Sequence, residues 1–266
     1  MPRYHYTKNC IVDSLRSLEI SKGDVVFSHI SLLELGLCQS DVVDTFISAM
    51  KEVIGEEGSF LTPSYSYSFC NGKDFDPLTT KSEVGAFSNA LISRHKMARS
   101  IDPLFSLVGF GPHTAELFKA LPPSSFGEDC VYERLLKANA KVCNIGISFF
   151  CFTPIHYLER TLNVPYRFDK VFSGTCILEN ERIPIEWDYY VRHLNECCVA
   201  DCSLLHNESL KRGITSQASL GLGQVYAAPL AQLYKLAENL IKQDQWCLVQ
   251  GNSESFIAHN ENPKNG

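Results

Sequence analysis

A histidine and a glutamate in the stretch TPIHYLERTLNVPYR, residues 153–167, have the spacing of a catalytic pair. Pro154 fits the first turn of a helix, Thr153 can cap it, and apolar residues then recur at helical spacing. On that helix His156 and Glu159 are three residues apart and are therefore neighbours. A carboxylate beside an imidazole orients the ring and stabilises its protonated form, as a general base requires. The same spacing also occurs in surface pairs with no catalytic role.

A second set of polar side chains follows a short apolar segment nearer the N-terminus. The segment VVF predicts a buried strand, and Ser28, His29 and Ser31 come directly after it. His156 likewise follows a buried strand that is predicted over residues 142–146. Because ligands bind at the carboxyl ends of strands in open α/β sheets, both sets are candidates for one site. Taken alone, His29 is more typical of a hydrogen-bonded structural histidine than of a functional one.

Strands and helices alternate through the first two thirds of the chain, which predicts a three-layer α/β domain with a mostly parallel central sheet. From Val171 the segment VFSGTCILENERIPIEW predicts an antiparallel hairpin instead. We expect helices over residues 188–210 and 230–241. We find no repeat and no Pro/Ser linker, so we expect one domain over residues 1–258 and a polar tail over 259–266. Helices are also predicted over residues 8–18, 41–54, 88–94 and 112–118, and in the segment VYERLLKANAK that precedes the strand at residue 142.

The composition argues against several classes of protein. The formal net charge is −6 and no run of basic residues stands out, so we expect no nucleic-acid partner. No window approaches the roughly 20 apolar residues of a membrane span. The N-terminal segment lacks the apolar core of a signal peptide. The 11 cysteines lack the spacing of a disulfide framework, so we expect a cytoplasmic protein with free thiols and no membrane partner.

Two cysteine hypotheses remain beside the histidine–glutamate pair. Cys198, Cys202 and His206 would share a helix face, but structural zinc sites usually need four ligands. We therefore treat these cysteines as small buried apolar residues and expect no metal. A cysteine hydrolase, with Cys151 as nucleophile and His156 as base, is conceivable. Five residues apart in one segment is poor geometry for it.

Five further segments follow one another in a fixed order along residues 10–170. They are SHISLL (28–33), GSFLTPSYSY (58–67), SEVGAFSNAL (82–91), RSIDPLFSLVGFG (99–111) and TPIHYLE (153–159), the last followed by VPYR. In this order they resemble the motifs of the aminoglycoside 3-N-acetyltransferase family, also called antibiotic N-acetyltransferases. The Thr-x-x-His-x-x-Glu helix start is the hallmark of that family. One such motif is weak evidence, whereas five in the right order are strong.

The resemblance implies that the protein transfers an acetyl group from acetyl-CoA to an amine, on this family's own α/β fold. His156 would be the general base, oriented by Glu159 or Glu83. The Thr153 hydroxyl and a nearby backbone N–H would stabilise the oxyanion. Glu83 is equally able to cap the helix that follows it.

The resemblance also implies where acetyl-CoA binds. Ser28, His29, Ser31 and Leu32 would line its pantetheine arm. A second group would lie close to that arm or to the CoA phosphates, namely Arg99, Ser100 and Ser106. By contrast, the alternating Tyr65 and Tyr67 are more typical of packing than of substrate stacking.

One departure from the family concerns the acceptor. Antibiotic-modifying members usually carry a histidine where Phe105 stands here. We therefore expect an amino-sugar acceptor, with a nucleotide-linked sugar of polysaccharide synthesis as the main hypothesis and an aminoglycoside antibiotic as the alternative. A third hypothesis is a non-catalytic CoA- or sugar-binding protein, against which the intact Thr153, His156 and Glu159 argue. Transfer to oxygen rather than nitrogen, and a homodimer, are left open.

Overall fold

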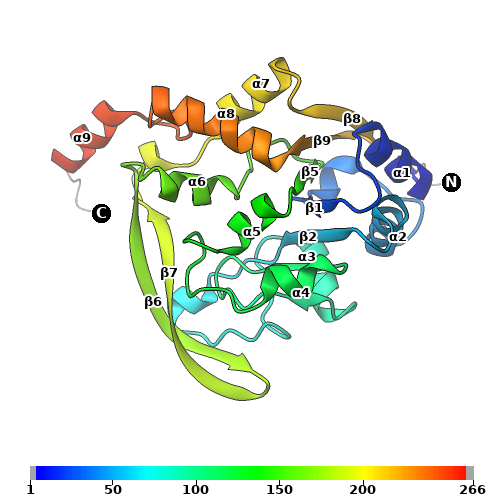
Figure 1. Ribbon diagram of the computed structural model, residues 1–266, viewed down its shortest axis with the longest axis horizontal. Coiled ribbons are helices and arrows are strands. Elements are labelled where there is room, and N and C mark those ends of the chain that lie inside the picture. Colours follow the sequence, from blue (N-terminus) through cyan, green and yellow to red (C-terminus); the bar gives the residue numbers. More distant parts are fainter. Residues whose placement is uncertain (1–3, 262–266) are drawn as a thin grey trace.

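The computed structural model describes residues 4–261 and places a β-sheet between two layers of helices (Figure 1). Within these residues the sheet has seven strands in the order β3-β4-β2-β1-β5-β9-β8. Its strands are β1 (Val25–Phe27), β2 (Ser59–Pro63), β3 (Ala98–Arg99), β4 (Leu107–Phe110), β5 (Lys141–Ile145), β8 (Ser216–Leu220) and β9 (Gly223–Pro229).

Parallel pairing occupies the centre of this sheet. Strand β1 pairs parallel with β2 on one side and with β5 on the other. The strands that flank this centre pair antiparallel, β4 with β2 and β3, and β9 with β5 and β8. The predicted three-layer α/β class is therefore confirmed. Strands β3, β8 and β9, which the sequence analysis did not identify, extend the sheet at its two edges.

The two helical layers cover opposite faces of the sheet, because alternate strand residues point to opposite sides. Val25 and Phe27 pack in one apolar cluster, and Val26 between them packs in the other. The cluster of Val26 is covered by α1 (Lys8–Ser17), α2 (Val42–Ile54) and α3 (Ala86–Ser93). The cluster of Val25 and Phe27 is covered mainly by α4 (His113–Phe118), α5 (Val131–Lys137), α6 (Ile155–Thr161), α7 (Ser203–Lys211) and α8 (Leu230–Gln243).

A separate two-stranded sheet lies against the second cluster. It is the predicted hairpin, formed by β6 (Arg167–Leu178) and β7 (Glu181–Arg192), and it curves along one side of the molecule in Figure 1. Two neighbouring loops add to it through the bridges of Phe75 with Cys176 and of Ser124 with Asp188.

The helix predicted over residues 188–210 is wrong in its first half. Strand β7 continues to Arg192, and α7 begins only at Ser203, after a 3-10 turn η3 (Glu196–Cys198). The aromatic side chains of Trp187 and Tyr190 are buried against the core from this strand. Aromatic residues favour strands when the opposite strand gives them a surface to pack on, and that surface depends on the tertiary structure.

The start of α6 also differs from the prediction. Thr153 was expected to cap the helix with its side chain, but the residue before the first helical one is Pro154, and no side-chain cap bond forms. The first N–H groups instead donate to nearby carbonyls, Ile155 to Phe152 and His156 to Thr153. Because these bonds satisfy the first turn, the Thr153 hydroxyl is free of the capping role.

The loops after β1 and β5 meet at the carboxyl edge of the sheet. Asn144 is fully buried; its Oδ1 accepts the N–H of His29, and its Nδ2 donates to the carbonyl of Cys151. Gly146 adopts a positive φ of 71°, and any side chain there would collide with the carbonyl of Ser31. The two polar segments that follow parallel strands are therefore joined into one edge site.

The described part of the chain ends in a helix at its C-terminus. The polar tail predicted from residue 259 begins inside α9 (Ser253–Glu261), and residues 262–266 lie outside the described part of the chain. None of the helices within residues 4–261 combines the length and apolar character needed to cross a membrane.

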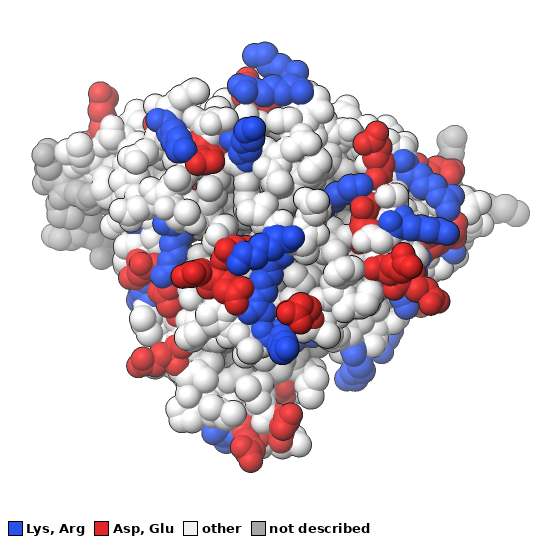
Figure 2. Space-filling model, viewed as in Figure 1, with Lys and Arg blue, Asp and Glu red and all other residues white. Residues whose placement is uncertain are grey.

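On the face shown in Figure 2, Lys and Arg side chains are interspersed with Asp and Glu. The remaining 3-10 turns are η1 (Leu32–Leu35) and η2 (Ser68–Asn71).

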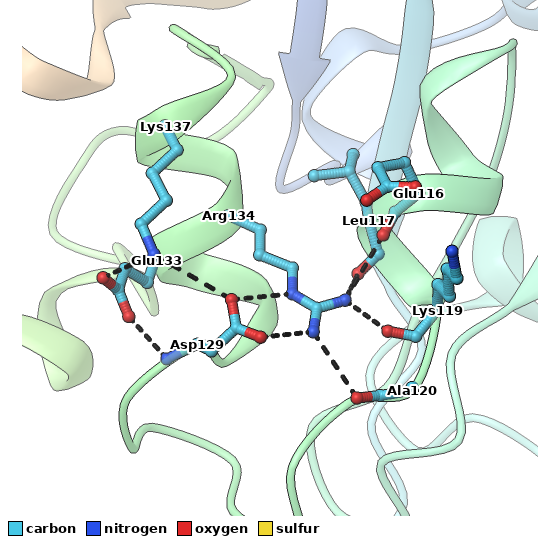
Figure 3. Close-up of polar contacts among 8 residues, drawn as sticks. All are labelled: Glu116, Leu117, Lys119, Ala120, Asp129, Glu133, Arg134 and Lys137. Carbon is cyan, nitrogen blue, oxygen red and sulfur yellow. Dashed lines mark hydrogen bonds and ion pairs between the residues drawn. The ribbon is translucent and has the colours of Figure 1, made fainter.

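Arg134, on α5, forms hydrogen bonds that hold the loop following α4 against α5 (Figure 3). Its guanidinium binds both carboxylate oxygens of Asp129, at 3.2 and 2.6 Å. It also donates to carbonyls at and after the C-terminal end of α4, where helical partners are missing, namely those of Glu116, Leu117, Lys119 and Ala120. This loop continues to Phe126, which contacts the candidate site described below.

We predict that Arg134→Met lowers the free energy of unfolding by about 2–4 kcal/mol, because the carbonyls and Asp129 lose a charged donor. Lys137→Met is the matched control, since this neighbouring lysine is 60% exposed and pairs only with carboxylates. Urea denaturation of both variants measures the effect. Equal losses in the two would contradict the role of Arg134.

Candidate active site

The centre of the candidate site is a buried carboxylate with three partners. Glu159 on α6 accepts from His156 Nδ1 at 2.6 Å and from the Tyr166 hydroxyl at 2.9 Å. Arg167, the first residue of β6, places its Nε 2.7 Å from the same carboxylate. The side chains of Glu159 and Arg167 are only 1% and 3% exposed, so both charges are removed from water together. The predicted pairing of His156 with Glu159 is present in the structure.

Charges within this cluster set the protonation of its members. Burial, and after it the Arg167 guanidinium, lowers the pKa of His156 below its ordinary value, and Glu159 opposes this shift. Burial alone would raise the pKa of Glu159, but Arg167 and His156 overcome it and lower this pKa to about 2. At neutral pH Glu159 is therefore ionised and His156 is neutral, which is the state that a general base needs.

Arg167 was not identified as a site residue from the sequence, although it stands in the quoted VPYR segment. Its NH2 group lies 3.4 Å from His156 Nε2, and its NH1 group donates to the carbonyl of Tyr190 at 3.1 Å. Arg167 therefore connects both strands of the hairpin, β6 and β7, to His156 and Glu159. Tyr166 was missed for the same reason: tyrosine and arginine in such a segment are typical of many structural roles.

The second histidine lines a cavity at the same sheet edge. This cavity has a volume of about 240 Å³, and its wall includes His29, Tyr65, Tyr67, Cys151 and Thr153. Thr153 is three residues before His156 in the chain, whereas His156 itself is not among the residues that line the cavity. The structure therefore brings the predicted SHISLL and TPIHYLE segments together.

His29 acts as a neutral hydrogen-bonding group in this wall. Its Nε2 accepts the N–H of Thr153 at 3.3 Å, which leaves the ring proton on Nδ1, 3.7 Å from the Cys151 sulfur. Burial, and to a smaller extent His156, lowers the pKa of His29 to about 3. His29 is therefore uncharged across the physiological range.

The cysteine alternatives find no support in this geometry. Cys151 contacts His29 rather than His156, and burial raises the pKa of its thiol to about 11, so little thiolate forms at neutral pH. Within the described residues, no group of three or more His, Cys, Asp or Glu side chains is arranged to hold a metal ion.

The other residues predicted for the pantetheine arm lie beside the cavity rather than in its wall. Ser28 is fully buried, and its hydroxyl donates to the carbonyl of His29 at 3.3 Å. Ser31 donates its N–H to Ile145, and Leu32 packs against the core on the face of α1–α3. Ile30, which lies between Ser28 and Ser31 in the chain, does line the cavity. The segment thus reaches the cavity through His29 and Ile30.

The residues predicted near the CoA phosphates form an internal network instead. Arg99 donates to the hydroxyls of Ser64 and Ser106 and to two backbone carbonyls, with Phe75 beneath its guanidinium. Ser100 and Ser106 are fully buried, and the Ser100 hydroxyl accepts the N–H of Leu107. The structure does not bring these residues to the cavity. Glu83 likewise accepts the N–H of Tyr67 at 2.7 Å, and within the described residues no hydrogen bond or ion pair joins it to His156.

Phe105 belongs to an aromatic cluster between the cavity and the hairpin. Its ring lies 4.8 Å from Tyr65, 4.7 Å from Phe126 and 4.9 Å from Tyr189, measured between ring centroids. Phe126 in turn presents its ring to His156 at 5.2 Å. Phe105 is 4% exposed, so it shapes this side of the site by filling space.

Comparison with known proteins identifies the family to which the chain belongs. The family model "Aminoglycoside 3-N-acetyltransferase" matches residues 27–242, so the chain belongs to the aminoglycoside 3-N-acetyltransferase family. The aminoglycoside N(3)-acetyltransferase III of Salmonella sp is 23% identical in a match that covers 60% of this chain and 62% of that protein. The chain thus spans less than two thirds of the length of this relative.

Solved structures share the fold at low sequence identity. The structure "AAC-IIIb binary with CoASH" superposes with a TM-score of 0.79 at 18% identity, covering 89% of this chain and 96% of that one. A sisomicin-bound AAC-VIa structure gives a TM-score of 0.78 at 20% identity, covering 90% and 98%. These similarities establish the fold of the described residues.

We predict that Arg167→Gln raises the pKa of His156 by about one unit or more. The substitution removes a cation beside Nε2, and the Glu159 carboxylate then interacts with the imidazole as its one remaining charged partner among the described residues. The other titratable groups that act on His156 are Glu159 and His29, and His29 stays neutral. Since the base must be neutral, the acid limb of the pH–rate profile should move to higher pH. NMR titration of the His156 ring measures the same pKa without turnover.

Two further variants make this test specific. Arg167→Lys keeps the positive charge and should leave the acid limb near that of the wild type. Arg160→Gln removes another arginine, which pairs with Asp169 and Asp188 instead of Glu159. An unchanged His156 pKa in Arg167→Gln would contradict the electrostatic role of Arg167.

Proposed function

We propose that the protein is an acetyl-CoA-dependent N-acetyltransferase that acts on an aminoglycoside. The observation that carries the proposal is the neutral His156, held by the ionised Glu159 beside a cavity at the carboxyl edge of the sheet. Membership of the aminoglycoside 3-N-acetyltransferase family supports the reaction type. The complex of AAC-IIIb with CoA supports the donor.

In the proposed reaction the acceptor amine attacks the thioester carbonyl of acetyl-CoA. His156 Nε2 takes the amine proton, because Nδ1 is engaged with Glu159. A C–N bond forms, the C–S bond breaks, and CoA leaves as a thiolate that receives a proton. Glu159 stabilises the transient imidazolium, and Arg167 beside it favours the return of the proton from His156. The acceptor amine displaces the weak contact of Arg167 with Nε2.

The acceptor is assigned from the relatives rather than from the site. The Salmonella relative is named for an aminoglycoside, and the AAC-VIa structure contains sisomicin. These names favour the aminoglycoside over the nucleotide-linked amino sugar that the sequence analysis placed first.

A nucleotide-linked amino sugar is retained as the second candidate. The observation in its favour is aromatic surface at the cavity: Tyr67 lines it and is 38% exposed, and an aromatic face can stack on a nucleobase. Phe105, packed behind Tyr67, would support that face.

The test follows CoA release with a chromogenic thiol reagent. The purified protein is mixed with acetyl-CoA and, in separate reactions, with aminoglycosides such as sisomicin or with nucleotide-linked amino sugars. Faster release with the aminoglycosides supports the proposal, and faster release with the sugars supports the second candidate. Acetyl-CoA binding without release in any mixture would contradict both and favour a non-catalytic binding protein.

We predict that His156→Ala lowers turnover by a factor of about 100 or more, because the amine loses its proton acceptor. Calorimetric titration should show nearly unchanged acetyl-CoA affinity. His95→Ala is the control, since this histidine pairs with Asp44 away from the cavity. Turnover of His156→Ala equal to that of the wild type would remove His156 as the base.

A further inference from the structure

Two buried tyrosines share a hydrogen bond in the wall of the cavity. The hydroxyl oxygens of Tyr65 and Tyr132 are 2.8 Å apart, and the two side chains are 4% and 0% exposed. Tyr65 lines the cavity, whereas Tyr132 lies behind it on α5, with its ring stacked on Phe126. From its alternation with Tyr67 in the sequence, Tyr65 was predicted to have a packing role.

The surroundings fix the direction of this hydrogen bond. Tyr132 is fully buried, and among the described residues its hydroxyl has Tyr65 as its hydrogen-bond partner. A buried O–H group needs an acceptor, so Tyr132 donates its proton to the Tyr65 oxygen. The proton of Tyr65 is then free to be donated elsewhere. Burial raises the pKa of Tyr65 well above its ordinary value, so this proton is retained at neutral pH.

Thr153, which is close in sequence to the candidate base, is a second neighbour of Tyr65 in the cavity wall. Thr153 is among the groups that act on the pKa of Tyr65, and it lowers this pKa against the larger effect of burial. Both residues line the cavity, and Thr153 is one turn before His156 on the chain.

The backbone near Thr153 offers no donor for an oxyanion. The N–H of Thr153 is bound to His29 Nε2, and Pro154 has no N–H. The N–H groups of Ile155 and His156 donate to carbonyls in the same turn. Residues 153–156 therefore do not supply the backbone N–H that was predicted to act beside the Thr153 hydroxyl, and that N–H stays unassigned. Within this turn, a side-chain hydroxyl is therefore the group that can stabilise negative charge.

We propose that Tyr65 is a catalytic residue that donates its hydroxyl proton in a hydrogen bond to the thioester oxygen of acetyl-CoA, with Tyr132 orienting it from behind. This inference rests on the proposed acetyl transfer. As the amine attacks, the carbonyl π pair moves onto oxygen, and Tyr65 stabilises that charge without giving up its proton. When the carbonyl re-forms, the C–S bond breaks and the thiolate leaves. A donor already in place needs no reorganisation during this step.

The experiment compares the kinetics of three single-hydroxyl deletions. Tyr65→Phe should lower kcat by about 100-fold, as loss of one oxyanion donor does, while acetyl-CoA affinity by calorimetry stays within about twofold. Tyr132→Phe should lower kcat by a smaller factor, because Tyr65 keeps its hydroxyl but loses its orientation. Tyr6→Phe is the control: this tyrosine is equally buried but packs in the other core, and its turnover should equal that of the wild type.

The outcomes separate this inference from the proposed function. A wild-type protein that acetylates an acceptor, together with a Tyr65→Phe variant within twofold of its kcat, overturns the role of Tyr65 and leaves the proposed function standing. A fall in kcat accompanied by an equal loss of acetyl-CoA affinity would mean that Tyr65 only binds the donor, which also overturns it. A wild-type protein that binds acetyl-CoA but transfers nothing overturns both.

Discussion

The rest of the candidate site depends on the burial of one carboxylate. An ionised carboxyl group without partners costs far more to bury than a small domain can supply. Glu159 is compensated by His156, Tyr166 and Arg167, which come from α6, the segment before β6, and β6 itself. The same carboxylate that orients the imidazole therefore also holds Arg167, the first residue of the hairpin, in place. Breaking any one of these partnerships would leave a buried charge underpaired, so the three elements hold their positions together.

Around this carboxylate the sheet edge is assembled from segments that are distant in the chain. Asn144 joins the loops after β1 and β5 through bonds to His29 and Cys151. The parallel pairing of β1 with β5 puts both loops at one edge. Aromatic rings from Phe105 and Phe126 then fill the space between the cavity and the hairpin. The result is a wall in which most polar groups are already hydrogen-bonded, which leaves a few side chains to contact a ligand.

Much of the fold and part of the site could be predicted from sequence. The helical spacing of His156 and Glu159, and the apolar runs that became β1 and β5, are local patterns, and all three are present. The predictions that failed concern long-range effects. The length of β7 depends on pairing with β6, and the internal bonding of Arg99 depends on Ser64 and Ser106 coming next to it. No spacing within one segment contains that information.

Local patterns in the sequence indicate the element order through the sheet centre, the helical spacing of His156 and Glu159, and the family motifs, because each of these involves residues close together in the chain. Long-range packing selects Glu159 rather than Glu83 as the partner of His156, places Arg167 against both members of that pair, and binds the Thr153 N–H to His29. The protonation of a buried group depends on every charge and donor around it, and packing rather than sequence distance determines which groups those are.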